Sequence, residues 1–216
     1  MNASFYDCLT PAQKDLYDRS VRVQQYLRGE LVHSHSGDCL GIVRVLSGVI
    51  SVNMLSDEGR EISLFRIREG ESFVLSAMCV LKNVPFESNI EAECDTTLEI
   101  LSSHVLAGIV KENKVAECYL YRFAASRFSD IIMKLQRVVF GSLERRLAEF
   151  LLNECEYSGK SKLEFTHEQI AKNIASSREP VTRMLKRFSN DGLVVLGRGI
   201  ITITDKAELA ALCGMK

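Results

Sequence analysis

The sequence predicts an α+β fold in three parts: an antiparallel, jelly-roll-like β-roll, one long helix, and two short helices followed by a β-hairpin. Three observations predict it. Turn signals that contain glycine recur roughly every ten residues between residues 21 and 100, which is typical of short antiparallel strands. Residues 114–139 hold neither proline nor glycine. After residue 166, two short amphipathic patterns precede a Gly197-Arg198-Gly199 turn.

The length and composition allow more than one domain. The chain has 216 residues, 46% of them hydrophobic and 25% charged, which is ordinary for a globular protein with a real core. We expect residues 1–113 to form the β-roll, 114–140 the long helix and 141–216 the C-terminal domain. Phe140-Gly141-Ser142 breaks the helical pattern and supplies a hinge between the last two.

The charge is distributed unevenly along the chain. The net charge of -1 means that any affinity for nucleic acid has to come from a local patch. Residues 143–216 hold 12 basic and 10 acidic side chains, against 15 and 18 in the rest of the chain, and residues 172–198 hold six basic and two acidic ones. A basic region on a nearly neutral chain favours specific contact with DNA over the action of a nonspecific basic tail.

The seven cysteines are scattered, and none has the C-x-x-C spacing of a metal or redox motif. No signal peptide and no apolar run long enough to span a membrane is recognisable. We therefore expect a reduced, cytoplasmic protein without membrane association, whose cysteines serve as small core hydrophobes.

The first element is a short helix over Thr10–Ser20. Thr10 and Gln13 form a capping box, and Pro11 suits the first helical position. Among the strands that follow, Val49–Met54 and Ile62–Ile67 alternate on either side of a turn at residues 57–60, which predicts a hairpin.

The long helix, from about Lys114 to Val139, has apolar side chains at alternating spacings of three and four. This pattern is an a/d seam flanked by basic residues. The seam residues are Tyr121, Ala124, Phe128, Ile131, Leu135 and Val138. The stripe either lies on the β-roll or pairs with a second copy of the chain; we favour the homodimer, because the β-roll needs only one face of so long a seam.

After a helix over Leu143–Cys155 and a short strand at residues 163–165, a helix-turn-helix is predicted. Thr166 and Gln169 cap a helix that runs to about Ile174, and Ser177 caps a second helix over residues 177–189. The side chains that point from it to the core are Val181, Met184 or Leu185, and Phe188. The strands Leu193–Leu196 and Ile200–Thr204 around the glycine turn form a wing, which makes the domain a winged helix-turn-helix.

The exposed face of the second helix has the chemistry of a base reader. Arginine binds guanine O6 and N7 bidentately, glutamate accepts from cytosine N4, and threonine offers a methyl group and a hydroxyl group. The expected base-reading residues are Arg178, Glu179, Thr182 and Arg183, and those expected to contact the DNA backbone are Lys172, Lys186, Arg187 and Arg198. The alternative is that this face is simply a charged helix surface in contact with solvent, without a role in DNA binding.

Several motifs together resemble the Crp/Fnr family of bacterial transcription regulators, over nearly the whole chain. They are Tyr26-Leu27-Arg28-Gly29-Glu30, Gly37-Asp38, the Gly48 and Gly59 turns, Gly70-Glu71, the long helix, and the run from Ser177 to Arg183. The resemblance implies a β-roll of the cyclic-nucleotide-binding type, a dimerisation helix, a palindromic double-stranded DNA site and RNA polymerase as a partner, with activation or repression left open.

The resemblance also suggests which half-site is read. Arg178, Glu179 and Arg183 match the base-reading positions of the catabolite-activator branch, which implies a half-site similar to TGTGA. Thr182 departs from the small residue of that branch and is closer to the serine of the anaerobic-regulator branch.

The residues that bind the effector in the members of the family that bind cyclic AMP are not present in this chain. Val74-Leu75 and Phe86-Glu87 stand where members that bind cyclic AMP have a glutamate and an Arg-Ser pair, and an apolar pocket near Glu87, Glu91 and Glu93 would repel a phosphate. This argues against a cyclic nucleotide, and the lack of an N-terminal cysteine cluster argues against an iron–sulfur cluster. Haem stays open, as does an unknown small molecule or no ligand at all. The candidate haem ligands are His33, His35, Met78, Cys79 and His104.

Two other functions compete with a sensing regulator. His33-Ser34-His35 with Asp38 resembles half of a cupin metal site, but no second half follows, and no phosphate loop, nucleophile elbow or zinc spacing is present. We therefore expect no enzyme. A constitutive DNA-binding dimer without an effector is the second alternative.

Overall fold

A computed structural model of the chain describes residues 4–33, 40–56, 61–74 and 88–214. The chain forms two compact units, one from Met1–Arg60 with Leu64–Ile131 and the other from Glu61–Ser63 with Ile132–Lys216. The division falls inside the long helix. No described helix is long and apolar enough to cross a membrane.

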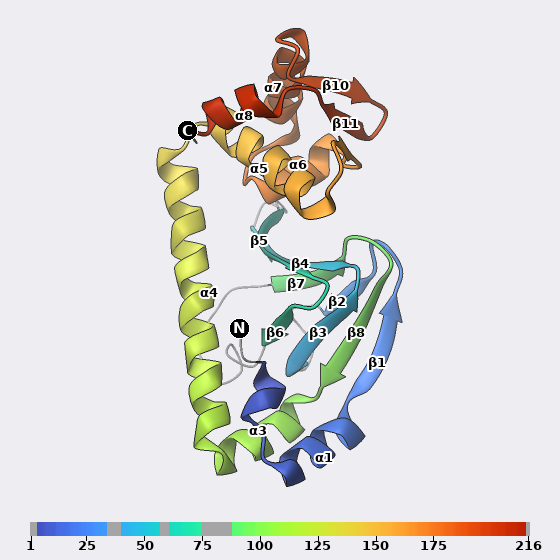
Figure 1. The fold of residues 1–216 in the computed structure, drawn as a ribbon, viewed down its shortest axis with the longest axis vertical. Coiled ribbons are helices and arrows are strands. Elements are labelled where there is room, and N and C mark those ends of the chain that lie inside the picture. The colour runs from blue at the N-terminus through green and yellow to red at the C-terminus, as the bar shows by residue number, and fades with distance from the viewer. Residues whose placement is uncertain (1–3, 34–39, 57–60, 75–87, 215–216) are drawn as a thin grey trace. The chain divides into compact units, whose positions relative to one another are not determined.

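The N-terminal unit contains the predicted β-roll (Figure 1). Its strands are β1 Arg22–Tyr26, β2 Leu31–His33, β3 Ile42–Ser47, β4 Val49–Leu55, β5 Glu61–Arg68, β6 Ser72–Val74, β7 Ser88–Ala92 and β8 Thr96–Leu101. They form two four-stranded sheets, ordered β1-β8-β3-β6 and β2-β7-β4-β5. Val43, Val45, Ile50 and Leu98 are fully buried in one hydrophobic cluster of this β-roll. The neighbouring positions of β4 and β5 confirm the hairpin, although its turn lies outside the described residues.

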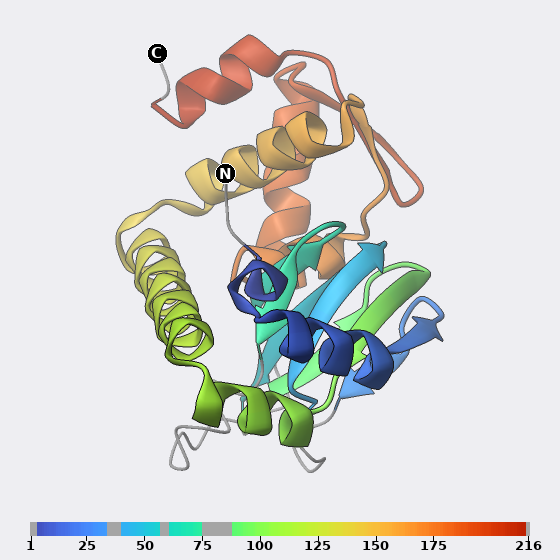
Figure 2. The same ribbon diagram turned by 60° about the horizontal axis from the view of Figure 1, so that its bottom comes forward.

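Short helices close one end of the β-roll. They are the 3-10 helix η1 Phe5–Cys8, α1 Pro11–Ser20 and α3 Ser103–Glu112. Both hydrogen bonds of the Thr10–Gln13 capping box form, as predicted. Figure 2 shows α1 and α3 beside each other at this end. Neither η1 nor α3 was predicted from the sequence. Phe5, Leu106 and Ile109 of these two elements are buried in one cluster with Leu120.

The helix α4 spans Lys114–Phe140, as the lack of proline and glycine predicts. Asn113 begins it, because its side-chain oxygen accepts from the backbone N–H groups of Val115 and Ala116 at 3.0 and 3.1 Å. Gly141 ends it. A Cβ at this position would lie 2.4 Å from the Arg137 carbonyl oxygen, so the chain can pass here only as glycine.

The C-terminal unit is a winged helix-turn-helix with one further helix. Its elements are α5 Leu143–Ser158, β9 Lys162–Leu163, α6 His167–Asn173, α7 Arg178–Asn190, β10 Val194–Gly197, β11 Ile200–Ile203 and α8 Lys206–Leu212. The strands form one sheet in the order β10-β11-β9. Leu147, Leu151, Ile170, Leu185 and Phe188 share its core. The helix α8, which packs on α5, was not predicted.

The cysteine prediction holds for part of the chain. Cys155 and Cys213 are buried and free, as expected of small core residues. It is wrong for Cys118, which is exposed because it lies on an outward-facing position of α4.

Candidate nucleic-acid interface

The turn between α6 and α7 sets the position of the second helix. Ala175 has a φ of 52°, a left-handed conformation that a residue with a Cβ adopts only under constraint. The backbone N–H of Ser176 donates to the Ala171 carbonyl at 2.9 Å, and Thr166 and Gln169 form the predicted capping box at the start of α6. The short, strained turn therefore leaves α7 little freedom relative to α6.

Arg146 of α5 holds this turn through two hydrogen bonds, a role that was not predicted from the sequence. Its Nη1 donates to the carbonyl oxygens of Ile174 at 2.6 Å and of Ala175 at 3.1 Å. These carbonyls lie at the end of α6, where no further helical N–H can reach them. Desolvation lowers the pKa of Arg146, yet arginine stays charged at any ordinary pH. A long-range contact of this kind has no local sequence signature.

The helix α7 has one buried and one exposed face. Val181, Leu185 and Phe188 are at most 1% exposed, as predicted. Arg178 and Glu179 occupy the exposed first turn. One detail of the prediction is wrong: Ser177 is the N-cap residue, but its side chain makes no capping hydrogen bond. The start of α7 is instead set by the strained turn before it.

Two of the expected base readers form an ion pair. Arg183 Nη1 lies 3.4 Å from Glu179 Oε1, one helical turn away, and the side chains are 71% and 80% exposed. An exposed pair at this spacing contributes only about 0.3–0.5 kcal/mol. Both side chains therefore stay available to groups on a docked partner.

The four residues expected to contact the DNA backbone differ in their surroundings. Lys186 is exposed on α7, and Arg198 is exposed at the wing tip, where Gly199 takes a φ of 69° to close a two-residue turn. Arg187 lies 3.3 Å from Glu144 and 3.6 Å from Asp191. Lys172 is partly buried on α6. Lys186 and Arg198 thus present their charge most openly.

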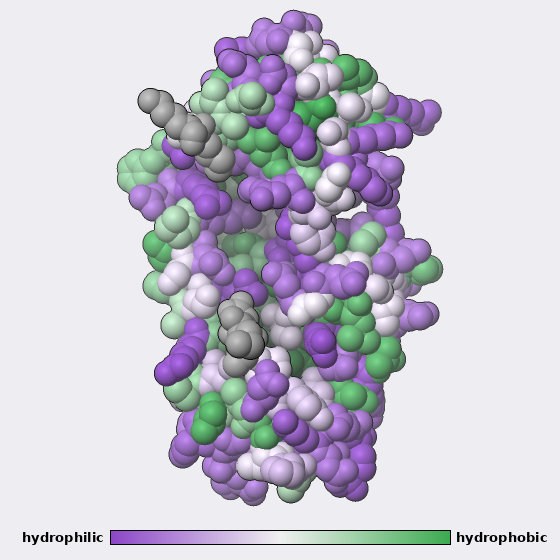
Figure 3. Space-filling model, in the orientation of Figure 1, coloured by the Kyte–Doolittle hydropathy of each residue, from purple (hydrophilic) through white to green (hydrophobic). Residues whose placement is uncertain are grey.

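The seam residues of α4 divide into two sets. Tyr121, Phe128 and Leu135, each seven residues apart, are 60%, 64% and 55% exposed. Ala124, Ile131 and Val138 are only partly exposed. Ile132 and Val139, one position further along, are 44% and 60% exposed and extend the apolar stripe. In Figure 3, hydrophobic residues recur along the edge where α4 runs.

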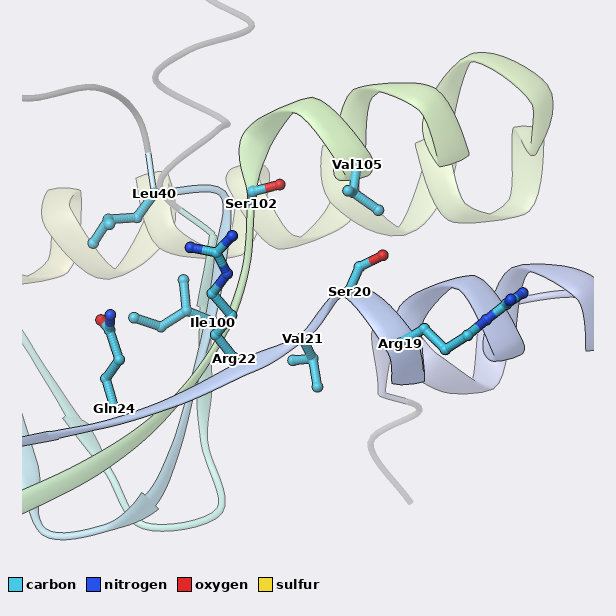
Figure 4. A pocket seen from close by; sticks show the side chains of 9 residues that line it. All are labelled: Arg19, Ser20, Val21, Arg22, Gln24, Leu40, Ile100, Ser102 and Val105. Carbon is cyan, nitrogen blue, oxygen red and sulfur yellow. The ribbon is translucent and has the colours of Figure 1, made fainter.

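Little of the expected effector site can be located. Val74 is 3% exposed in the core of the N-terminal unit, whereas Leu75, Phe86 and Glu87 lie outside the described residues. A separate pocket of about 500 Å³ lies where α1, β1 and the start of α3 meet, and Arg22 reaches from β1 toward Leu40 in it (Figure 4). Val74, the one described residue of the expected site, does not line it.

The candidate haem and metal ligands that lie within the described residues are His33 and His104, and they belong to different elements. His33 lies in β2, where burial lowers the pKa of its ring, and His104 is exposed on α3. His35, Asp38, Met78 and Cys79 lie outside the described residues. Within the described part of the chain, no three His, Cys, Asp or Glu side chains are placed to hold one metal ion.

A chain in which a β-roll and a long helix are followed by a winged helix-turn-helix belongs to the class of transcription regulators. Residues 145–212 match the Crp-like helix-turn-helix domain. A crystal structure of a transcriptional regulator of the Crp/Fnr family from Eubacterium rectale ATCC 33656 superposes with a TM-score of 0.91, at 39% identity over 98% of both chains. The chain belongs to the Crp/Fnr family of transcription regulators. This family is not one of enzymes, which sets the cupin alternative aside.

More distant relatives cover most of the chain as well. The transcriptional regulator SdrP of Thermus thermophilus is 26% identical over 175 residues, 78% of this chain and 82% of its own. A CRP-like cAMP-activated global transcriptional regulator of Mycobacterium tuberculosis is 23% identical, over 96% of this chain and 95% of its own.

Proposed function

We propose that this regulator acts as a homodimer that reads a palindromic DNA site through α7, with Arg178, Glu179, Thr182 and Arg183 at the base edges. One observation carries the proposal. The face of α7 that is not needed for the core bears Arg178, Glu179 and Arg183, while Val181, Leu185 and Phe188 anchor the opposite face. A helix fixed in this way can enter a major groove as a rigid element.

The chemistry of this face favours base contacts over phosphate contacts. A carboxylate close to phosphates is unfavourable unless it accepts from a base donor such as cytosine N4, so Glu179 belongs at a base edge. Arg183, one turn away, can bind a guanine bidentately. Lys186 and Arg198 contact the backbone, with smaller contributions from Arg187 and Lys172.

The dimer follows from the exposed stripe on α4. Tyr121, Phe128, Ile132, Leu135 and Val139 expose apolar area that a second α4 would cover in a two-stranded coil. Two copies related by a two-fold axis place two α7 helices on half-sites one helical turn apart. The half-site suggested by Arg178, Glu179 and Arg183 is similar to TGTGA.

The β-roll is the proposed sensor, and RNA polymerase is the proposed protein partner. Allosteric control requires an effector that binds one arrangement of the DNA-binding heads more tightly than another. The replacement of the phosphate-binding residues argues for an effector other than a cyclic nucleotide. An absorption spectrum and a native mass spectrum of protein purified without oxygen would reveal haem, a cluster or a small ligand.

The decisive experiment compares Arg183→Ala with wild type on a selected site and on a variant with one base pair changed. We expect Arg183→Ala to lose about 1–3 kcal/mol of discrimination at one base pair. The matched control, Lys186→Ala, should weaken both duplexes equally and reduce the salt slope by about two, one for each subunit of the dimer. Equal losses on specific and scrambled DNA for Arg183→Ala would contradict the proposal.

A further inference from the structure

His167 connects the two helices of the helix-turn-helix at the reading face. It is the first residue of α6, and its ring is partly buried against α7. The Nδ1 atom lies 2.9 Å from Oγ1 of Thr182, one of the proposed base readers.

The direction of this hydrogen bond follows from its neighbour. Thr182 Oγ1 lies 2.8 Å from the Arg178 carbonyl oxygen, to which it donates. A hydroxyl group has one proton, so toward His167 the same oxygen can only accept. Nδ1 of His167 therefore bears a hydrogen. Burial and the positive charges of Arg178 and Lys186 lower the pKa of this ring, which favours its neutral form with the hydrogen on Nδ1.

The two bonds limit what Thr182 can offer to a base. A threonine side chain has a hydroxyl proton, two lone pairs and a methyl group. The hydroxyl proton is donated to the Arg178 carbonyl oxygen, and one lone pair accepts from Nδ1 of His167. The side chain is thereby held in one rotamer, and its methyl group is the part that is left to contact a base. Such a methyl group can contact the C5-methyl of thymine, the apolar mark of a T·A pair in the major groove.

We propose that His167 is a positioning residue for specificity: it holds the Thr182 hydroxyl so that Thr182 selects thymine through methyl contact rather than through hydrogen bonding. This inference rests on the proposed function, since it requires α7 to lie in the major groove. It assigns a role to a side chain that does not itself have to touch a base. It also accounts for a threonine at a position where the hydroxyl group is already engaged.

The experiment begins with a palindromic site selected by the wild-type protein from random duplexes. Each thymine of the half-site is then replaced in turn by deoxyuridine, which removes only the C5-methyl group. Loss of one buried methyl contact should weaken wild-type binding roughly fourfold at one position. Thr182→Ser, which keeps the hydroxyl group and loses the methyl group, should show no such penalty. Thr182→Val, which keeps the methyl group, should retain it.

The His167 variants test the positioning role. His167→Ala should reduce the deoxyuridine penalty to less than about twofold, and His167→Asn, which keeps a donor near the Nδ1 position, should restore it. In the Thr182→Val background, His167→Ala should leave the penalty unchanged, because no hydroxyl group remains to be held. Hydrogen exchange of α6 and α7 verifies that each variant is folded.

Two failures can be told apart. If the selection gives no sequence preference, or if Arg183→Ala discriminates like wild type, the proposed function is wrong. If Arg183 reads its base pair but no deoxyuridine weakens wild-type binding, or if His167→Ala keeps the full penalty, then the function stands and the role of His167 is overturned.

Discussion

The helices α7 and α4 each expose a face that the core does not use, and the two faces differ in kind. On α7 the exposed face is Arg178, Glu179 and Arg183; on α4 it is a stripe of apolar side chains that includes Phe128 and Leu135. A charged face suits a hydrated, phosphate-rich partner, whereas an apolar stripe gains only when a second apolar surface covers it. The difference is consistent with the two partners proposed above: DNA for α7 and a second copy of the chain for α4.

The largest effect is expected from breaking the α4 face. The double variant Phe128→Glu, Leu135→Glu places like charges opposite each other in a paired helix, so the protein should sediment as a monomer. Because two linked heads bind a palindrome much more tightly than one, DNA affinity should fall by about 100-fold or more. Sedimentation velocity and fluorescence anisotropy measure the two effects.

Ser126→Glu is the matched control, since Ser126 is exposed on α4 away from the stripe. It should leave both the mass in solution and the DNA affinity near wild type. A double variant that still sediments as a dimer would show that another surface joins the two copies.

The next effect concerns the support of α7. Arg146→Met removes the donor to the Ile174 and Ala175 carbonyls and should destabilise the C-terminal unit by about 2–3 kcal/mol. Faster hydrogen exchange across α6 and α7 in the full chain would report it. Arg145→Met removes the single hydrogen-bonded pair with Glu149 at 2.9 Å, in which the arginine is 55% exposed, and should cost about 1 kcal/mol or less. Equal effects of the two variants would contradict the role of Arg146.

A smaller effect tests the strain in the turn. Ala175→Gly relieves the left-handed backbone at a φ of 52° and should stabilise the C-terminal unit by roughly 0.5–1 kcal/mol. Ser176→Gly, at a neighbouring residue without a positive φ, should instead lower stability, because glycine adds freedom to the unfolded chain. Urea unfolding measures both. Destabilisation by Ala175→Gly would mean that the turn is not strained.

The smallest effect is a dependence on pH that is confined to α7 and its neighbours. The pKa of His167 is lowered from 6.5 in the folded protein, so unfolding takes up a proton as the pH falls below that value. Stability from this group is present above pH 6.5 and is lost as the pH falls through the folded pKa. Hydrogen exchange at two pH values should show α6 opening more readily in acid, and His167→Asn should remove that part of the change. If His167→Asn keeps the same pH dependence as wild type, the effect comes from another group.

Local sequence signals predicted much of this fold. The capping boxes at Thr10 and Thr166 locate two helix starts because both partners lie within one turn of each other. The buried side of α7 followed from the spacing of Val181, Leu185 and Phe188. These features depend on neighbours in sequence, which a single sequence displays.

Contacts between distant residues could not be predicted in the same way. The bond from Arg146 to the Ile174 carbonyl spans 28 residues, and that from His167 to Thr182 spans 15. Neither pair has a spacing that marks it. The strained φ of Ala175 was missed for a related reason, since left-handed turns are ordinarily marked by glycine.

The Glu179–Arg183 pair bears on how fast the regulator can search a chromosome. An unpaired guanidinium binds any DNA phosphate within reach. A guanidinium that is already paired, as in Arg183, gains less free energy from such a phosphate, by about 0.3–0.5 kcal/mol. For two subunits this amounts to roughly a fourfold shorter dwell on random sequence. At the proposed half-site the carboxylate would accept from a base donor and the arginine would bind a guanine, which would compensate for the opened pair. If these two side chains read the site as proposed, their pairing also hastens departure from every other sequence.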